Sequence, residues 1–381
     1  MRILYIAHNT ADASKGAANA DLSLLAAMSH RGHEVEQVWN VGEPRKIRHD
    51  NLHLLLEAPR KCEAEVIQRL ANAEYDVILT NQPLSWRAAR AVRRLGRATL
   101  FVARSHGWEP RVFEEQRSFL TADRRGQIRQ VASNALRPWL HRQNRLLLRW
   151  ANGVVVCSRD DRDYLLTTGG VSSDRILALA PGLPEEFLRS APPSLSVERC
   201  HRILYVGQFA LFKAPEVVAS VMTEVLTQRP NVLASWVCAA SDHPKVAALL
   251  PESVRQRVTL LDWMPRAELL KVYDSHGIYL FPSLFEGFAQ TFLEAMARGM
   301  AVLATRIDGM AQAIQDGENG FLFDRGQRTE MAKLAIELLD GRADVIRIGR
   351  GARKTATAYT WSRAAETLEE FFHGLKNLTT Q

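Results

Sequence analysis

The chain has 381 residues, a formal net charge of +7, 46% hydrophobic residues and 24% charged residues. This length exceeds one ordinary hydrophobic core and suits two domains, and the composition excludes a disordered chain. The four cysteines include no C-x-x-C pair, which argues against a zinc site or a disulfide framework.

The N-terminal half is predicted to start as a parallel α/β domain. Its first apolar run, residues 2–7, is too short for a signal peptide and is predicted to be a strand. A helix should begin near Gly16 and end at Gly32, and a strand over 34–39 should follow. The G-x-G-x-x-G fingerprint of dinucleotide-binding proteins is absent. No run approaches the ~20 apolar residues of a membrane span, so we expect a cytoplasmic protein.

Strands are also predicted over 77–80 and 99–103, and His106 comes just after the second of them. Open parallel sheets bind their ligands at the carboxyl ends of the strands. His106 is therefore a candidate ligand-binding residue, and the alternative is an ordinary histidine in a surface loop.

The segment 111–149 is rich in arginine, with large apolar residues interleaved, and Pro138 is expected to break or begin a helix there. One interpretation is a solvated helix face. The other is a surface that contacts anionic lipid headgroups or a lipid-diphosphate acceptor. The segment is joined to no nucleic-acid-binding motif, so a nucleic-acid partner is not expected.

The stretch Asp161-Arg162-Asp163 has the D-x-D spacing of some metal sites. It follows a predicted buried strand, 153–158, that ends at Ser158. We interpret it as the acidic first turn of a helix whose N-cap is Ser158. A strand over 176–180 and a proline-containing linker within 189–199 then lead to a second α/β unit that begins near Arg202.

The C-terminal half is organised around residues 278–304. A buried strand is predicted over 278–281, a loop follows, and a helix should run from about Ala289 to a C-cap glycine, Gly299. A further strand is predicted over 301–304. This strand–loop–helix–strand unit places the loop at the carboxyl edge of a parallel sheet.

The loop and helix carry two carboxylates, Glu286 and Glu294. If all eight intervening steps were helical, they would lie about 12 Å apart along the axis. Between them are the first backbone N–H groups of the helix, at Ala289, Gln290 and Thr291, which suit a diphosphate. Carboxylates accept hydrogen bonds from sugar hydroxyls, so a diphosphate site between two carboxylates suggests a nucleotide-diphosphate sugar as the ligand. In this interpretation Glu294 contacts the ribose and Glu286 contacts the transferred sugar. The alternative is an acidic loop followed by a surface helix.

The pair Glu286-x7-Glu294 resembles the Glu-x7-Glu motif of the family-4 retaining glycosyltransferases. This resemblance implies an α/β protein of the GT-B fold, with two Rossmann-like domains and a cleft between them. It places an acceptor-side domain at 1–188, with a C-terminal helix 362–381 packing back on it, and a nucleotide-sugar-binding domain at 200–361.

The resemblance also implies roles for residues in both halves. Gly16 would lie close to the donor, although Ala17 replaces the second glycine usual in the family, and His106 would contact the donor sugar. Lys213 would hold the diphosphate, but Gln208 stands where an arginine is expected, and Met264 would contact the base through its backbone. Trp263 could stack on the base, but we expect it in the core. The predicted catalytic residues are His106, Lys213 and Glu286, and the predicted donor-binding residues are Gly16, Gln208, Met264, Gly287, Phe288, Ala289, Gln290, Thr291 and Glu294.

The resemblance implies a metal-independent retaining transferase without a cofactor. A UDP-, GDP- or other nucleotide-sugar would donate to a glycan, lipid-linked or small-molecule acceptor in cell-surface polysaccharide or glycoconjugate synthesis. The basic segment 111–149 would then contact the inner face of the membrane. Two alternatives remain: a degenerate transferase that binds a sugar nucleotide without transfer, and a sugar-nucleotide epimerase of the same fold.

Overall fold

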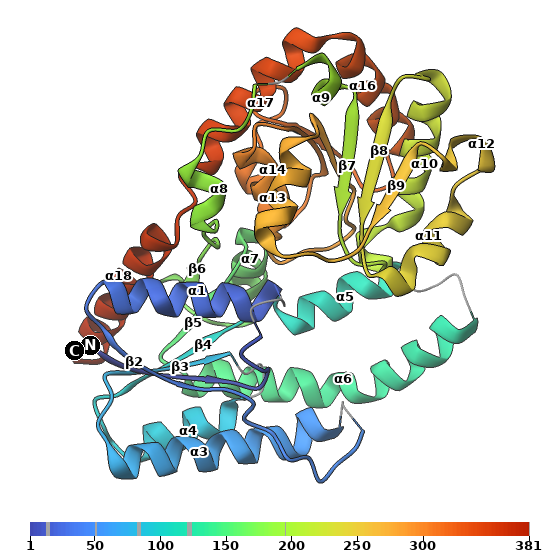
Figure 1. Ribbon diagram of the computed structural model, residues 1–381. Coiled ribbons are helices and arrows are strands. Elements are labelled where there is room, and N and C mark those ends of the chain that lie inside the picture. Colours follow the sequence, from blue (N-terminus) through green and yellow to red (C-terminus); the bar gives the residue numbers. More distant parts are fainter. Residues whose placement is uncertain (13–15, 50–51, 82–84, 120–123, 195, 381) are drawn as a thin grey trace. The chain divides into compact units, whose positions relative to one another are not determined.

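A computed structural model describes residues 1–12, 16–49, 52–81, 85–119, 124–194 and 196–380, without the side chains at 113, 116–119, 124–136 and 379–380. The chain divides into two compact units. Unit 1 comprises Met1–Gly182 and Trp361–Gln381, and unit 2 comprises Leu183–Thr360 (Figure 1). Each unit is described by itself.

Unit 1 is built on a parallel six-stranded sheet with the order β2-β1-β3-β4-β5-β6. The central strands β3 and β4 are buried at every position, as expected for a parallel sheet with both faces covered. The strands are β1 Arg2–Ala7, β2 Glu34–Val38, β3 Val77–Asn81, β4 Leu100–Arg104, β5 Gly153–Val156 and β6 Ile176–Ala178.

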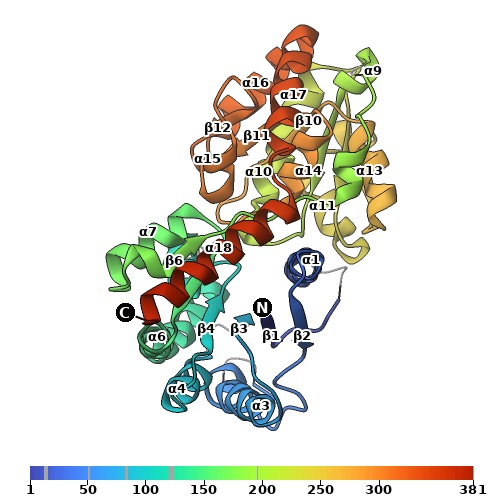
Figure 2. The same cartoon turned by 90° about the vertical axis from the view of Figure 1, so that its left-hand side faces the viewer.

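Helices cover both faces of this sheet: α1 and α18 lie on one face, and α3 and α4 lie on the other (Figure 2). In α18, Leu368 and Phe372 are buried in the same cluster as Tyr5, and Arg31 donates to Glu369 at 2.7 Å. The helices are α1 Gly16–His30, η1 His53–Glu57, α3 Ala58–Asn72, α4 Trp86–Arg94, α5 Glu109–Phe119, α6 Arg124–Trp150, α7 Arg159–Thr168, η3 Ser173–Arg175 and α18 Trp361–Thr380.

The prediction that Pro138 breaks or begins a helix is wrong, because α6 continues through it from Arg124 to Trp150. Proline removes one backbone hydrogen bond and crowds the preceding turn, so an isolated helix would be destabilised there. Here the following turns bury Gln143, Leu147 and Leu148 in unit 1, and this tertiary packing maintains the helix.

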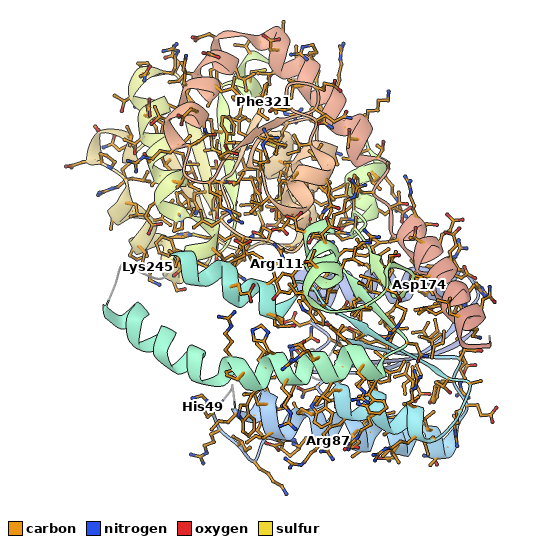
Figure 3. The ribbon with its side chains drawn as sticks, turned by 180° about the vertical axis from the view of Figure 1, so that it is seen from behind. His49, Arg87, Arg111, Asp174, Lys245 and Phe321 are labelled. Atoms are coloured by element: carbon orange, nitrogen blue, oxygen red, sulfur yellow. The ribbon has the colours of Figure 1, made fainter. Side chains whose placement is uncertain are left out.

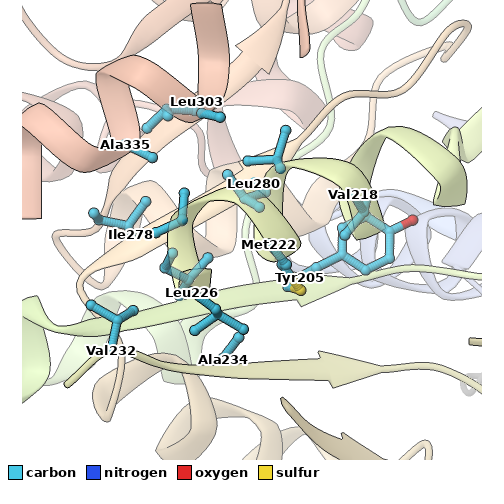
Figure 4. Close-up of a cluster of buried hydrophobic side chains, with 14 of the residues drawn as sticks. Tyr205, Val218, Met222, Leu226, Val232, Ala234, Ile278, Leu280, Leu303 and Ala335 are labelled. Atoms are coloured by element: carbon cyan, nitrogen blue, oxygen red, sulfur yellow. The ribbon is translucent and has the colours of Figure 1, made fainter. Parts of the chain in front are cut away.

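Unit 2 repeats the architecture with the parallel order β12-β11-β10-β7-β8-β9. Its core lies between the sheet and flanking helices, where Tyr205, Met222, Leu226, Ile278 and Leu280 pack together (Figure 4). The strands are β7 Arg202–Val206, β8 Leu233–Val237, β9 Val258–Leu261, β10 Ile278–Phe281, β11 Ala301–Thr305 and β12 Phe321–Phe323. The helices are α8 Glu185–Arg189, α9 Val197–Cys200, η4 Leu211–Lys213, α10 Pro215–Gln228, η5 Ala240–Asp242, α11 His243–Leu249, α12 Glu252–Arg255, α13 Arg266–Asp274, α14 Gln290–Ala297, α15 Asp308–Ala313, α16 Arg328–Asp340 and α17 Arg342–Ala356.

The predicted helix end at Gly299 is confirmed. Gly299 has φ +70°, a left-handed conformation that glycine adopts without a steric penalty. Its N–H donates to the Met296 carbonyl at 2.9 Å, and the Met300 N–H donates to the Ala295 carbonyl at 3.1 Å. This pair of bonds closes the end of α14 as a Schellman motif.

A buried arginine fixes the end of α14 to the start of unit 2. Arg298 forms an ion pair with Asp274 at 2.7 Å, and its guanidinium also donates to the carbonyls of Phe187 at 3.3 Å and Ser190 at 2.9 Å. Its side chain is only 1% exposed. One side chain therefore connects α13, α14 and the segment after α8.

The described part of the chain contains no helix that is long and apolar enough to cross a membrane.

Candidate functional site

The loop between β10 and α14 presents the N-terminus of α14 without a side-chain cap. Its N-cap is Ala289, which has extended backbone angles and offers no side-chain acceptor to the helix. Ser, Thr, Asp and Asn are the residues preferred at this position, because their side chains accept from these N–H groups. An alanine in this place leaves the positive end of the helix dipole available to an anion. The helix begins at Gln290, one residue after the predicted start.

Two of the predicted catalytic residues meet in unit 2. The Lys213 ammonium, at the end of η4, forms an ion pair with the Glu286 carboxylate, and the side chains are 13% and 11% exposed. Lys213 Nζ also lies 5.1 Å from the ring centroid of Phe281, the last residue of β10. From the sequence, Lys213 was expected to bind the diphosphate and Glu286 the transferred sugar, and an ion pair between them was not predicted. Their low exposure makes this charge pair less screened than a surface pair.

The backbone around this pair contains two strained residues. Ala214, directly after Lys213, has φ 50°, and Asp308 at the start of α15 has φ 44° and a fully buried side chain. Asp308 Oδ2 accepts the Glu286 N–H at 3.4 Å. Left-handed non-glycine residues are costly and concentrate at functional sites. No sequence signal marks an alanine or aspartate that will adopt this conformation, so both were missed.

Glu294 is a buried carboxyl and not part of a surface helix. Its residue is 4% exposed, and its Oε2 accepts the Tyr273 hydroxyl at 3.0 Å. Burial raises the pKa of Glu294, and the nearby Arg266 charge and the Tyr273 hydrogen bond oppose that rise. The alternative of a surface helix is therefore wrong for α14, since residues from Phe292 to Ala297 are all buried. The ~12 Å spacing does not apply, because residues 286–289 precede the helix.

The other predicted donor-binding residues lie at the same sheet edge or near it. Gln208 is exposed two residues after the end of β7, and Gly287, Gln290 and Thr291 are half-buried around the start of α14. Phe288 packs against Gly309, where an added Cβ would lie 2.6 Å from the ring. This glycine is what allows the ring to approach the start of α15.

Met264 is half-buried against the core of unit 2, while its neighbour Trp263 is 47% exposed. The expectation that Trp263 is a core residue is wrong. Trp263 lies in the loop after β9, which is an edge strand. Its backbone N–H donates to Asp262 Oδ1 at 2.8 Å. A sequence alone does not reveal that the preceding strand is at the edge.

In unit 1, His106 follows β4 and contacts a buried acid on α1. His106 Nε2 lies 3.0 Å from Asp21 Oδ1, and Asp21 is fully buried. Asp21 also forms an ion pair with buried Arg104 and accepts the Asn81 amide at 2.6 Å. Asp21 was missed by sequence reasoning, although an acid on the buried face of an amphipathic helix is itself a signal.

Gly16 is the first residue of α1 and is exposed, and an added Cβ would meet nothing within 4 Å. No neighbouring residue of the protein therefore requires a glycine at this position. The expectation that a donor ligand lies close to the Gly16 backbone stays a prediction. Residues 13–15 of the predicted loop lie outside the described residues.

The interpretation of Ser158 as an N-cap is confirmed, because its Oγ accepts the Asp161 N–H at 3.1 Å. Asp161 is buried and pairs at 2.6 Å with Arg111. Figure 3 labels the position of Arg111. Asp161 therefore serves a structural ion pair. The described residues contain no group of three His, Cys, Asp or Glu side chains that could hold a metal ion.

The basic segment 111–149 is only partly described, because residues 120–123 and the side chains at 113, 116–119 and 124–136 lie outside the described part of the chain. Within the described part, Arg137 forms an ion pair with Glu114 at 2.8 Å, and Trp139 is 58% exposed. The solvated-face and lipid-surface interpretations both stay predictions.

Glu109, at the start of α5, is predicted to make the stability of unit 1 depend on pH. Burial raises the pKa of Glu109 from 4.5 to about 7, and its Oε2 has no hydrogen-bond partner among the described residues. The folded state thus binds this proton more tightly than the unfolded state, so stability falls as pH rises from about 4.5 to 7. Glu109→Gln cannot ionise and should be more stable than the wild type at pH 8 by about 3 kcal/mol.

Urea unfolding at pH 8 and pH 5 tests this expectation, because the advantage of the Glu109→Gln variant should shrink below about 1 kcal/mol at pH 5. Glu366→Gln on α18 is the control, since that side chain is 56% exposed. An equal advantage at both pH values would show that ionisation of Glu109 does not cause the effect.

Two family models match consecutive parts of the chain. The model described as Glycosyltransferase Family 4 matches residues 15–187, and the model described as Glycosyl transferases group 1 matches residues 200–341. Together they cover most of both units.

Curated relatives point the same way. The D-inositol 3-phosphate glycosyltransferase of Corynebacterium diphtheriae is 29% identical over 239 residues, which cover 58% of this chain and 56% of that protein. The enzyme of the same name from Nocardia farcinica is 27% identical over 238 residues, with 58% and 52% covered. The chain therefore spans little more than half the length of these relatives.

Solved structures share the fold over the whole chain. Sucrose-phosphate synthase from Thermosynechococcus elongatus has a TM-score of 0.77 and 19% identity, covering 98% of this chain and 99% of that chain. Anabaena Alr3699/HepE in complex with UDP has a TM-score of 0.71 and 17% identity, covering 100% of both chains. With its two Rossmann-like units the chain has the GT-B fold, and it belongs to glycosyltransferase family 4, among the glycosyl transferases of group 1.

Proposed function

We propose that the protein transfers a sugar from a nucleotide-diphosphate sugar to an acceptor hydroxyl, with retention of the anomeric configuration and without a metal ion. The observation that carries the proposal is the Lys213–Glu286 pair beside the uncapped N-terminus of α14. Two loops that meet at this pair supply the groups: the loop before α10 offers the Lys213 cation for a diphosphate, and the loop before α14 offers backbone N–H groups for the diphosphate and a carboxylate for sugar hydroxyls.

In this mechanism the chain's own groups stabilise the charge that develops on the departing diphosphate. Lys213 and the N-terminus of α14 supply positive charge where the phosphate oxygens gain negative charge, an electrostatic contribution to the rate. Glu286 orients the transferred sugar, and Glu294 accepts from the ribose. His106, in unit 1, is proposed to contact a sugar substrate. The departing phosphate assists deprotonation of the acceptor hydroxyl on the same face of the sugar.

The relatives and structural neighbours suggest which ligands to test first. The curated relatives are named for an inositol phosphate acceptor, and the HepE and TarM structures were solved with UDP. We therefore propose a UDP-sugar as the first donor to try and a glycan, lipid-linked or small polyol acceptor. A lipid-linked acceptor, a contact of the 111–149 segment with the inner membrane face and a role in polysaccharide or glycoconjugate synthesis belong to this proposal.

Glu286→Ala should lower kcat about 10- to 100-fold with the donor at saturation, because the transferred sugar loses an oriented acceptor. The same change removes the partner of Lys213, so the affinity for the nucleoside diphosphate product should stay equal or rise. Steady-state transfer rates and calorimetric titration with the diphosphate measure the two effects. Glu337→Ala, on a side chain that is 58% exposed, is the control. Unchanged transfer by the Glu286 variant would remove this residue from the mechanism.

A degenerate transferase is the second candidate, and exposed Gln208 in place of the expected arginine favours it. Thermal-shift measurements with UDP, GDP, ADP and their sugars identify the nucleotide in either case. Product analysis with and without an acceptor then separates the functions. Transfer requires the acceptor, a degenerate protein yields no transfer product, and an epimerase alters the donor sugar without an acceptor.

A further inference from the structure

The buried contact between Asp21 and His106 has consequences for how the histidine meets a substrate. Asp21 lies on α1 and is fully buried, and His106 lies just after β4 with its side chain 25% exposed. Both carboxylate oxygens are within reach of the ring, at 3.0 and 3.1 Å from Nε2. The ring is therefore attached to the rigid part of unit 1 on one side and reaches solvent on another.

The chemistry of this contact selects one imidazole tautomer. An ionised carboxylate only accepts hydrogen bonds, so the Nε2 atom that faces Asp21 must carry the proton. In the neutral ring Nδ1 then has the lone pair. Cys157 Sγ lies 3.9 Å from Nδ1, at the outer limit of a thiol hydrogen bond, and its S–H is closer to the Ser105 carbonyl, at 3.4 Å. Nδ1 is thus the ring nitrogen that can accept a hydrogen bond from a ligand hydroxyl.

The surroundings of Asp21 keep its carboxylate in place. Arg104, 3% exposed in its side chain, forms an ion pair with it, and Asn81 Nδ2 donates to Oδ2 at 2.6 Å. The Asn81 carbonyl in turn lies 2.9 Å from His8 Nδ1. A buried carboxylate that is paired and hydrogen-bonded in this way is a fixed acceptor, because every alternative orientation would leave a buried charge unpaired.

We propose that Asp21 is a positioning residue that fixes His106 as the Nε2–H tautomer and presents Nδ1 to a substrate hydroxyl. The inference rests on the proposed function insofar as His106 contacts the sugar substrate. The role of Asp21 is comparable to that of the carboxylates that orient metal-binding or catalytic histidines in other proteins.

The test uses two double variants that differ only in the acceptor. Asp21→Asn with Arg104→Met removes both buried charges and keeps a carbonyl oxygen facing Nε2. Asp21→Leu with Arg104→Met removes the charges and the acceptor together. Because neither variant leaves an unpaired buried charge, both are expected to fold, and thermal unfolding checks this.

The first readout is the tautomer of His106, measured by nitrogen-15 NMR at pH 8.5 and assigned by comparison with the His106→Gln variant. In the wild type and the asparagine double variant, Nε2 should give a protonated signal and Nδ1 an unprotonated one. The leucine double variant should give averaged signals like those of exposed His30. An unchanged Nε2–H tautomer in the leucine double variant would overturn the proposal.

The second readout is sugar transfer. The kcat of the leucine double variant should fall 10- to 100-fold, while the asparagine double variant should stay within about fivefold of the wild type. Equal rates for the two folded variants would also overturn the positioning role. If the wild type transfers no sugar, the proposed function fails while the tautomer measurement still decides what Asp21 does. The two failures are therefore distinguishable.

Discussion

Replacing Lys213 by methionine should lower the kcat for sugar transfer by a factor of about 100 to 1,000. The Lys213 ammonium is 13% exposed, so its field at a bound diphosphate is weakly screened by water. Gln208, which stands where a second cation is expected, is uncharged and cannot substitute for it. The loss should therefore exceed that of a transferase with two cations, and the affinity for the nucleoside diphosphate should fall as well.

Steady-state kinetics with varied donor and titration with the nucleoside diphosphate measure these losses. Lys333→Met on α16 is the matched control, because its side chain is 78% exposed and its removal also takes one positive charge from unit 2. Lys213→Arg keeps the charge with a different shape and should recover part of the rate. A Lys213→Met variant within threefold of the wild type would mean that another group carries the leaving-group charge.

Replacing Arg298 by methionine should destabilise unit 2 by about 3–5 kcal/mol. The substitution leaves the Asp274 carboxylate without its buried partner and removes donors from the carbonyls of Phe187 and Ser190. A methionine fills similar space, so the loss arises from unpaired polar groups and not from a cavity. The segment after α8 should become the first part of unit 2 to exchange its amide hydrogens.

Urea unfolding and hydrogen exchange measure both effects. Arg350→Met, at an exposed position of α17, is the control and should change stability by less than about 0.5 kcal/mol. Combining Arg298→Met with Asp274→Asn should recover part of the loss, because no unpaired charge is then buried. If the single and double variants were equally unstable, the carbonyl contacts and not the ion pair would dominate.

Local features of the fold could be predicted from sequence because they are encoded in adjacent residues. The apolar run of β10, the Ser158 cap and the Gly299 terminus each depend on residues within one or two turns of chain. The order of strands and helices in each unit follows from such signals. The resemblance to the family-4 glycosyltransferases could also be recognised from sequence, because Glu286 and Glu294 lie within nine consecutive residues.

Features that depend on distant segments could not be predicted. The Lys213–Glu286 pair joins residues 73 positions apart, and the Asp21–His106 contact joins residues 85 positions apart. The predicted helix break or start at Pro138 was wrong because the packing of later turns of α6 overrides the local preference against proline. The prediction that Trp263 is buried in the core was wrong because its exposure depends on the position of β9 at the edge of the sheet.

The closed charge pair in unit 2 has one more consequence. An isolated lysine at a helix N-terminus would attract any small phosphate that diffused past. With Glu286 already against Lys213, the ammonium charge is balanced, so Lys213 itself exerts little attraction on simple anions. A ligand gains from this site only by supplying both a counter-charge for the ammonium and hydroxyl donors for the displaced carboxylate. For the proposed transferase we therefore expect a sugar nucleotide to bind more tightly than free phosphate.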